Sequence, residues 1–358
     1  MLLIAEFIYL IKRCERKIQK VNMASAIDIR QLTKIYDGKV NALNGVDLTV
    51  KAASIFALLG PNGSGKTTLM RILTTQIHPT MGLARAFRYD VVKDDDKVRK
   101  IIGYVPQEMS VWTDITGFEN LLIYAKIYGV SSIQRKKAIW DALQNMGLED
   151  VANGPVKKYS GGMIRRLEIA CALLIKPKIL FLDEPTLGLD PSARKAVWEN
   201  LRSFKKEYGT TVFFNTHYMD EADLYSDEVA IINQGKIVKT GTASELKRSL
   251  HGEIISFCLA NNKTDSMHLS TAPLRREYEI LTKVRALNFV DDVTIHNCVM
   301  DVAVENGEVA MPLIIDVLRS EGISLEWIRA TRPTLDDVFL KYAGMRHMQD
   351  QSGYHYGI

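Results

Sequence analysis

SIFALLGPNGSGKTT, from Ser54 to Thr68, is the stretch that decides the fold. Its first part, SIFALLG, is an unbroken apolar run, which is typical of a short strand buried on both faces of a parallel sheet. The part from Gly60 onward fits the pattern G-x-x-x-x-G-K-[ST], a loop whose backbone N–H groups surround phosphates. The residues after it, TTLMRILTTQI, have helical spacing. The order strand, loop, helix predicts a phosphate-binding α/β domain.

The residues of this loop have distinct expected roles. Its glycines let successive backbone N–H groups turn inward at a helix N-terminus, where the helix dipole favours anions. Lys66 is expected to reach the β- and γ-phosphates of a nucleotide, and Thr67 to bind Mg²⁺. The expected nucleotide-binding residues of the loop are Gly60, Pro61, Asn62, Gly63, Ser64, Gly65, Lys66, Thr67 and Thr68.

Two more unbroken apolar runs predict further strands of the same sheet. They are KILFLDE at 178–184 and TTVFFNTH at 210–217, and the segment ARKAVWENLRSFKKEYG between them predicts a crossover helix. From Ile27 to Val50, apolar and polar residues alternate, which predicts antiparallel strands with turns at Asp37-Gly38 and Asn44-Gly45. The segment 117–146 predicts helices with a break at Gly129.

The pattern changes after Leu246. GEIISFCLA, the helical APLRREYEILTKVRAL, a hairpin VDDVTIH and CVMDVAV around Asn297, the helical AMPLIIDVLRSEG and SLEWIRA follow one another. This order, β-α-β-β-α-β, predicts a small ferredoxin-like α+β domain. LDDVFLKYAG predicts a last short helix, and residues 344–358 have no periodicity and are expected to form a loose tail.

Two adjacent carboxylates follow the second apolar strand. Phosphoryl transfer needs a positioned metal ion, an oriented water and charge stabilisation around the γ-phosphate. Asp183 ends the strand and is expected to orient the magnesium shell, and Glu184 is expected to face the attacking water. The alternative is an exposed acidic turn. His217 ends the third strand, a position where histidine is more often structural than catalytic.

The composition is that of a globular protein. The chain has 358 residues, 47% hydrophobic and 25% charged, enough for two domains that each bury a core. The net charge of +4 is spread along the chain, which disfavours nucleic acid as a partner. Its four cysteines are widely spaced, which argues against disulfides and structural zinc and favours a reducing cytosol.

The first 25 residues are expected to be an extension outside the core. The apolar run MLLIAEFIYLI is about half the length that spans a bilayer and precedes its basic residues, the reverse of a signal peptide. Three interpretations remain open. They are an interfacial amphipathic helix, a helix that docks on the body, and an upstream extension with the working chain starting at Met23.

Several motifs together resemble the ATP-binding-cassette (ABC) ATPases. GPNGSGKTT, GYVPQE, YSGGM, ILFLDEP, LGLD and the TH at Thr216-His217 occur in the order and approximate spacing of that family, over about Ala26 to Leu246. The resemblance implies an α/β P-loop NTPase fold with a parallel-sheet core, an antiparallel β subdomain and an inserted helical subdomain. This ATPase domain is expected at 26–247, and the ferredoxin-like accessory domain at 248–343.

The resemblance also implies roles for residues outside the phosphate loop. Tyr36 matches the aromatic residue that stacks on adenine, Asp190 the aspartate at the dimer interface, and Ser160, Gly161 and Gly162 the signature loop. Glu184 matches the catalytic carboxylate, His217 the histidine that contacts the γ-phosphate, and Gln107 the glutamine that links magnesium and water to a membrane partner. The implied metal set is Thr67, Gln107 and Asp183, and the implied catalytic set is Lys66, Gln107, Glu184 and His217.

The signature loop is predicted to serve a second subunit. Helices separate it from the phosphate loop, so two subunits arranged head to tail about a two-fold axis would each face the other's ATP. Tyr159 departs from the family, because leucine is usual before SGG. Since Ser160 and Gly162 match the family, we expect the site to remain active, with its properties modified by Tyr159.

The ending narrows the subfamily. TRPTLDDVFLKYAG, with THYMDEAD and SGGM, is similar to ATPase subunits of multidrug, polyketide-antibiotic (daunorubicin-resistance type) and sodium exporters. The expected function is therefore an ATP- and Mg²⁺-dependent ATPase on the cytoplasmic face of the cell membrane. It is expected to pair with a second ATPase subunit, homomeric or sibling, and to drive a separate multi-span permease.

Two other functions are weighed against export. One is a non-transport ABC ATPase acting on nucleic acid or ribosomes, disfavoured because the chain lacks a second cassette, a long coiled-coil insertion and a basic groove. The other is a regulatory ATP-binding module without turnover, which Glu184 disfavours.

Overall fold

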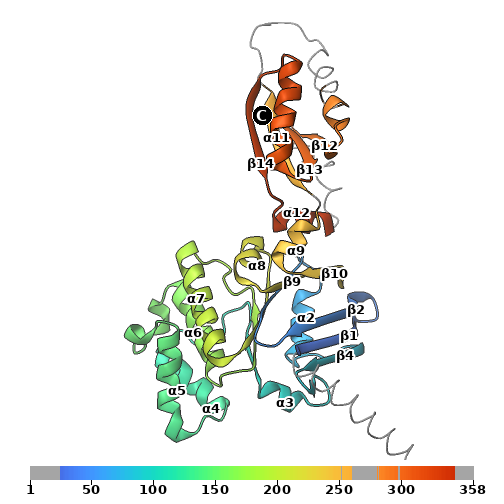
Figure 1. Ribbon diagram of the computed structural model, residues 1–358. Helices are drawn as coiled ribbons and strands as arrows, with labels where there is room; N and C mark the ends of the chain where they lie inside the picture. The colour runs from blue at the N-terminus through green and yellow to red at the C-terminus, as the bar shows by residue number, and fades with distance from the viewer. Residues whose placement is uncertain (1–24, 251, 260–279, 281, 297–298, 343–358) are drawn as a thin grey trace, which may run out of the picture. The chain divides into compact units, whose positions relative to one another are not determined.

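The computed structural model describes residues 25–250, 252–259, 280, 282–296 and 299–342 (Figure 1). These residues form two compact units, one running to Ala243 and including Tyr342, the other comprising Ser244–Lys341. The expected N-terminal extension up to residue 24, the C-terminal tail and the turn at Asn297 lie outside the described residues. The domain limits at 26–247 and 248–343 remain a prediction of where independent folding units begin and end.

A six-stranded sheet is the centre of the first unit. Its strand order is β10-β9-β3-β8-β7-β6. The strands are β3 (Ile55–Leu59), β6 (Ile102–Val105), β7 (Ile179–Asp183), β8 (Thr211–Thr216), β9 (Glu228–Asn233) and β10 (Lys236–Gly241). Strands β9, β3, β8, β7 and β6 pair in parallel, and only β10 is antiparallel to its neighbour β9. The three strands predicted from unbroken apolar runs are confirmed, and every residue of β3, β7 and β8 is buried.

Helices connect these strands, as a parallel sheet requires. They include α2 (Lys66–Leu73), α3 (Asp95–Arg99), α7 (Pro191–Tyr208) and α8 (Met219–Tyr225), and α9 (Ala243–Arg248) follows the last strand, β10. The predicted crossover helix is α7. Asp190 caps its N-terminus, Pro191 occupies the first position, and Gly209 ends it with a φ of 66°.

A second, antiparallel sheet has the order β2-β1-β4-β5. Its strands are β1 (Ser25–Tyr36), β2 (Val40–Lys51), β4 (Met81–Ala86) and β5 (Tyr89–Asp90). The predicted turn at Asp37-Gly38 is confirmed. The predicted turn at Asn44-Gly45 is wrong, because β2 continues through it. Gly45 has a φ of 66° at a register shift against β1, so this dipeptide forms a β-bulge.

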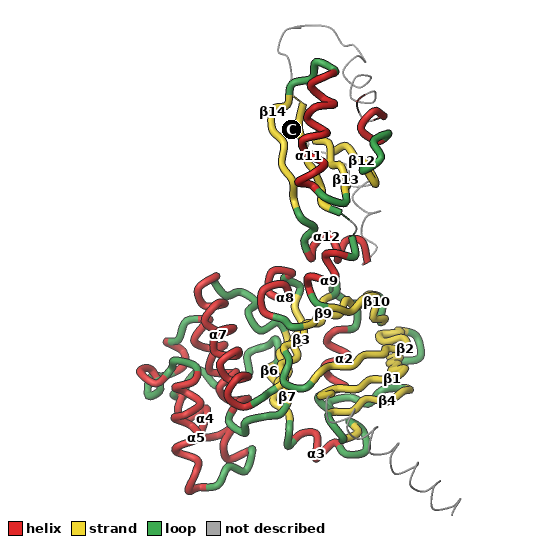
Figure 2. The backbone as a smooth tube through the Cα atoms, in the orientation of Figure 1, coloured by secondary structure: helices red, strands yellow, loops and turns green. Residues whose placement is uncertain are grey.

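A helical region contains α4 (Gly117–Ile127), α5 (Ser132–Asn145) and α6 (Gly161–Leu173), with short 3-10 turns η1 (Glu149–Val151) and η2 (Val156–Lys158). The predicted break at Gly129 is confirmed, and its φ of 71° explains why a glycine stands there. Thr116 and Glu119 form a capping box that starts α4. Figure 2 shows this predominantly helical part beside the strands of the first unit.

The second unit has the predicted ferredoxin-like arrangement. Its antiparallel sheet has the order β12-β13-β11-β14, from β11 (Glu253–Leu259), β12 (Val290–His296), β13 (Val299–Val304) and β14 (Leu325–Thr331). The helix α11 (Gly307–Ser320) packs on β11 and β14, and α12 (Leu335–Tyr342) follows. Of the helix predicted over 272–287, residues 280 and 282–287 are described; 280 and 282–285 are helical, and 286–287 lie in a turn, so the helix ends two residues before the predicted end.

Candidate functional site

The phosphate loop lies between β3 and α2, as the sequence predicts. Gly65 caps α2 with a φ of 106°, and a Cβ built there would lie 2.5 Å from the Ala42 carbonyl oxygen. Only glycine fits both the left-handed backbone and this close contact. The loop therefore presents backbone N–H groups at the N-terminus of α2.

Lys66 is buried beneath this loop, with 7% of its surface exposed. Its Nζ donates to the carbonyl oxygens of Gly60 at 2.7 Å and Pro61 at 3.1 Å. Burial lowers the pKa of Lys66, and the nearby carboxylates of Glu184 and Asp183 act in the opposite direction. Lys66 is thus a desolvated cation beside two carboxylates, at the base of a loop open to anions.

Asp183 ends β7 and is 3% exposed. Its Oδ1 accepts a hydrogen bond of 2.7 Å from Nδ2 of Asn215, its register partner on β8. This bond fixes the direction of the Asp183 carboxylate. Sequence analysis missed Asn215, although a polar residue inside the buried run TTVFFNTH, two positions before His217, was the available signal.

Glu184 follows directly and has an unusual backbone. Its φ is 48°, in the left-handed region that a residue with a Cβ rarely adopts. The backbone N–H of Glu184 donates to the Asn215 side-chain oxygen at 2.8 Å. The carboxylate is 8% exposed, so the turn places a nearly desolvated acid at the carboxyl end of the sheet.

His217 contacts Glu184. Its Nδ1 lies 2.9 Å from Glu184 Oε2. Since an ionised carboxylate only accepts hydrogen bonds, the Nδ1 of His217 supplies the hydrogen, and Nε2 is left to face another group. The His217 side chain is 45% exposed, unlike that of Glu184. The alternative of an exposed acidic turn at Asp183-Glu184 is excluded by the burial of both side chains.

The expected site residues Gln107 and Tyr36 are positioned by other strands than Asp183 and His217. Gln107 follows β6 after Pro106 and is exposed. Tyr36 ends β1 with a partly exposed ring, and Lys34 Nζ lies 5.0 Å from its centroid. Strand β6, which sequence analysis did not predict, explains the position of Gln107. It pairs with β7 and ends beside it, so Gln107 belongs to the same sheet edge as Asp183.

The signature loop starts another helix. Ser160 caps α6, and its Oγ accepts from the Met163 N–H at 3.3 Å. Gly162 lies against α7, where an added Cβ would be 2.8 Å from Ala193 Cβ. In Figure 1, α6 lies among α4, α5 and α7, apart from α2. Asp190 caps the neighbouring α7, with Oδ1 accepting from Ser192 and Ala193 at 3.0 Å each.

The phosphate loop and the side chains around it fit a nucleoside triphosphate with its metal ion. The Ser64 hydroxyl is a buried polar atom with no hydrogen-bond partner among the residues that the structure describes, and it belongs to the same loop as the Lys66 cation. Thr67 is exposed at the first turn of α2, and Asp183 supplies a buried oxygen donor. Hydroxyl and carboxylate oxygens are the donors that Mg²⁺ prefers, completed by phosphate oxygens.

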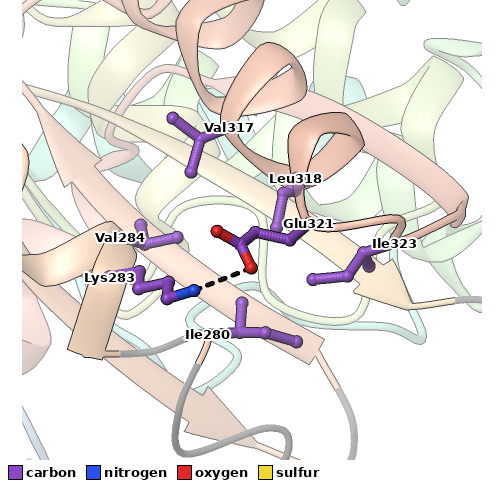
Figure 3. A pocket seen from close by; sticks show the side chains of 7 residues that line it. All are labelled: Ile280, Lys283, Val284, Val317, Leu318, Glu321 and Ile323. Atoms are coloured by element: carbon purple, nitrogen blue, oxygen red, sulfur yellow. Dashed lines mark ion pairs between the residues drawn. The ribbon is translucent and has the colours of Figure 1, made fainter.

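A pocket in the second unit has a different character. Figure 3 shows its lining of Ile280, Lys283, Val284, Val317, Leu318, Glu321 and Ile323. Lys283 Nζ and Glu321 Oε2 form an ion pair of 2.7 Å. Most of the other residues belong to the hydrophobic core of that unit or pack against it. This composition stabilises a fold and offers no cradle for phosphates.

The fold and the site together are those of a P-loop nucleoside triphosphatase. Comparisons with known proteins identify the family within this class. A family model described as "ABC transporter" matches residues 43–187. The daunorubicin/doxorubicin resistance ATP-binding protein DrrA of Streptomyces peucetius is 35% identical over 323 residues, which cover 89% of this chain and 92% of that protein. The linearmycin resistance ATP-binding protein LnrL of Bacillus subtilis is 30% identical, over 89% of this chain and 98% of its own length.

Solved structures agree. An ATP-binding subunit of an ABC transporter matches with a TM-score of 0.57 and 27% identity, covering 63% of this chain and 93% of its own. A dimeric post-hydrolysis ATP-binding cassette bound to ADP and Pi matches with a TM-score of 0.55 and 28% identity, over 60% and 98%. The chain belongs to the family of ATP-binding proteins of ABC transporters. It is an ATPase, and ATP is its nucleotide.

Proposed function

We propose that this chain is the ATPase subunit of an exporter, that two copies enclose two ATP molecules, and that the pair drives a separate membrane-spanning permease. The single observation that supports this best is the gathering of Lys66, Asp183, Glu184 and His217. Asp183, Glu184 and His217 stand at the carboxyl ends of the adjacent parallel strands β7 and β8, and Lys66 begins α2, which follows the neighbouring strand β3. Ser160 caps a different helix, α6.

The hydrolytic roles follow from this geometry. ATP supplies the γ-phosphoryl group that is transferred to water. Lys66 and the N–H groups of the phosphate loop neutralise phosphate charge, and Thr67, Gln107 and Asp183 would hold Mg²⁺, which would supply further positive charge there. Glu184 orients the water and accepts its hydrogen bond, while His217, held through its Nδ1, presents Nε2 toward the phosphate. Tyr36 stacks on the adenine ring.

The second subunit completes each site. The Ser160 hydroxyl and the N-terminus of α6 are exposed and suited to an anion. They belong to α6, however, which lies apart from α2 and its phosphate loop. Asp190 lies next to them at the interface. Reversing an open–closed equilibrium from 1:99 to 99:1 takes about 5.5 kcal/mol. One ligand at about a hundred times its dissociation constant supplies about 2.7 kcal/mol, so two ATP molecules suffice for closure.

The permease would dock on an apolar groove beside Gln107. The groove is lined by Met109, Val111, Trp112, Thr113, Asp114, Ile115 and Ile123. Met109 is 58% and Trp112 49% exposed. A partly buried helix of a membrane subunit fits such a surface, because exposed large apolar groups in a groove mark interaction sites. Among the residues that the structure describes, no helix has the length and hydropathy of a membrane span.

The direction of transport is inferred from the relatives. Those of Streptomyces and Bacillus are named for resistance to daunorubicin, doxorubicin and linearmycin. Resistance of this kind is obtained by removing the drug, so we place this subunit on the cytoplasmic face of a membrane and assign it an export function. The cargo pocket belongs to the permease.

Complementation between two inactive copies tests the shared sites. Lys66→Ala disables the phosphate loop and Ser160→Arg disables the signature loop, so each variant alone is expected to be inactive. A mixed dimer has one intact site of two. Mixing equal amounts should restore about a quarter of the wild-type ATPase rate if subunits exchange freely.

The control is a mixture of Lys66→Ala with Glu184→Gln. Lys66 and Glu184 of one copy serve the same ATP site. In the mixed dimer, one site therefore lacks Lys66 and the other lacks Glu184, so both sites are defective. That mixture should stay inactive. An absence of recovery in the first mixture, under conditions where ATP drives dimerisation of Glu184→Gln, contradicts the shared site.

A further inference from the structure

Arg165, on α6 five residues after Ser160, uses all of its hydrogen-bond donors on buried or partly buried partners. Its Nε donates to Pro185 O at 2.8 Å, and Nη2 donates to Asp183 O at 2.8 Å and Glu184 O at 3.2 Å. Nη1 donates to Pro106 O at 2.7 Å and to Glu168 Oε2 at 2.9 Å. A guanidinium has five N–H donors, so none remains unused.

Three of these acceptors are the consecutive carbonyls of Asp183, Glu184 and Pro185. They form the turn in which Glu184 has its left-handed φ of 48°. Such a conformation in a residue with a Cβ costs about 1–2 kcal/mol and persists only where surrounding contacts impose it. Asn215 binds the N–H side of Glu184 and Arg165 binds the carbonyl side.

The other two partners of Arg165, the Pro106 carbonyl and the Glu168 carboxylate, connect it to the segment Pro106–Ser110. Pro106 directly precedes Gln107. Glu168, 4% exposed, accepts through Oε1 from the Ser110 N–H at 2.6 Å and the Ser110 hydroxyl at 3.1 Å. The segment Pro106–Ser110 is thus attached at both ends to one buried ion pair.

We propose that Arg165 is a positioning residue for ATP hydrolysis, which holds the strained turn at Glu184 and connects it to the segment Pro106–Ser110 through Glu168. Arg165 touches neither the nucleotide-binding loop nor any reacting atom, and it acts through Glu184. A displacement of Pro106–Ser110, which lies beside the groove, is transmitted to the catalytic turn through one rigid planar group. This inference rests on the proposed roles of Glu184 and Gln107.

The test uses the full chain with Arg165→Gln and, as the matched control, Arg166→Gln. Arg166 is the next residue on the same helix and also donates to two carbonyls, those of Met146 and Gly147, which are remote from the catalytic turn. In Arg165→Gln, kcat should fall about 10- to 100-fold, the range expected when a catalytic group is displaced by about 1 Å. The KM for ATP and the affinity for a fluorescent ATP analogue should change less than about threefold.

A second readout separates positioning from loss of structure. Arg165→Gln should accumulate an ATP-bound dimer, seen by light scattering, as is also expected of Glu184→Gln. A merely destabilised protein loses active fraction and forms no such dimer. Arg166→Gln should keep kcat within about threefold of wild type and accumulate none.

Arg165→Lys is used if Arg165→Gln does not fold. Lysine keeps the charge, but its single ammonium cannot bind all five acceptors of the guanidinium, so kcat must still fall. Full activity of either folded Arg165 variant, with Glu184→Gln inactive, overturns this proposal alone. Full activity of Glu184→Gln instead overturns the proposed role of Glu184, and these two failures are distinguishable.

Discussion

At the scale of single residues, the buried carboxyl group of Glu221 makes the stability of the fold depend on pH. Glu221, on α8, is 1% exposed and lies 3.5 Å from Arg194 Nε. Burial raises the pKa of Glu221 to about 7, helped by the negative charge of Glu184 and opposed by Thr216, Arg194 and Trp198. The unfolded chain releases this proton near 4.5. The folded state therefore binds more protons between these two values.

The sign of the stability effect follows from this difference. As pH rises from about 4.5 to 7, the unfolded chain loses the Glu221 proton first, so stability falls across that window and stays lower above it. The full effect is about 3 kcal/mol. Glu221→Gln should therefore raise the melting temperature at pH 8 and have little effect at pH 4.5. Asp220→Asn, an exposed neighbour on α8, is the control, and an unchanged or lower melting temperature of Glu221→Gln at pH 8 contradicts the prediction.

At the scale of elements, the approach to α6 explains how the chain accommodates Tyr159. The tyrosine is 9% exposed, and its hydroxyl donates to the Val151 carbonyl at 2.7 Å, in the 3-10 turn η1. Burial raises the pKa of this phenol, so it remains a donor over the physiological range. The side chain anchors the helical region and leaves Ser160 free to cap α6.

Tyr159→Phe should therefore affect stability and not turnover. It removes one hydrogen bond, while the Val151 carbonyl keeps the bond that it accepts from the Gly154 N–H at 2.9 Å, so the cost is about 0.5–1.5 kcal/mol. The melting temperature should fall, while kcat for ATP stays near the wild-type value. A large fall in kcat without a change in melting temperature would assign the hydroxyl a role in catalysis instead.

At the scale of the whole molecule, the proposed function requires direct contact between the ATPase and a permease. Trp112 lines the proposed groove and contacts Tyr124, with ring centroids 5.8 Å apart. Trp112→Asp introduces a charge into an apolar contact without touching the nucleotide site. It should lower co-purification of the permease from detergent-solubilised membranes and abolish permease-stimulated ATPase activity, while the basal activity persists.

Ile133→Asp is the matched control for this prediction. Ile133 is 93% exposed at the start of α5 and does not line the groove. Its substitution should leave both permease capture and stimulation intact. Equal losses in the two variants would show a general effect of surface charge, and normal capture by Trp112→Asp would remove the groove as the docking surface.

Much of the site could be predicted from the sequence because its parts are short and continuous. The phosphate loop needs only a strand, a run of glycines and a helix, all within Ser54–Leu73. Asp183 ends one apolar strand and Glu184 follows it, His217 directly follows the next, and the carboxyl ends of parallel strands meet at one edge. The wrong turn at Asn44-Gly45 shows the limit, because the same dipeptide serves a turn or a bulge.

Only the tertiary structure decided what holds these residues in place. The partner of Asp183 is Asn215 across a strand register, and the partners of Arg165 lie up to 59 residues away in sequence. The left-handed backbone of Glu184 has no signal in its own residue type. A local sequence pattern specifies which groups are present. Long-range hydrogen bonds and burial, which depend on how the chain brings distant segments together, specify where those groups point.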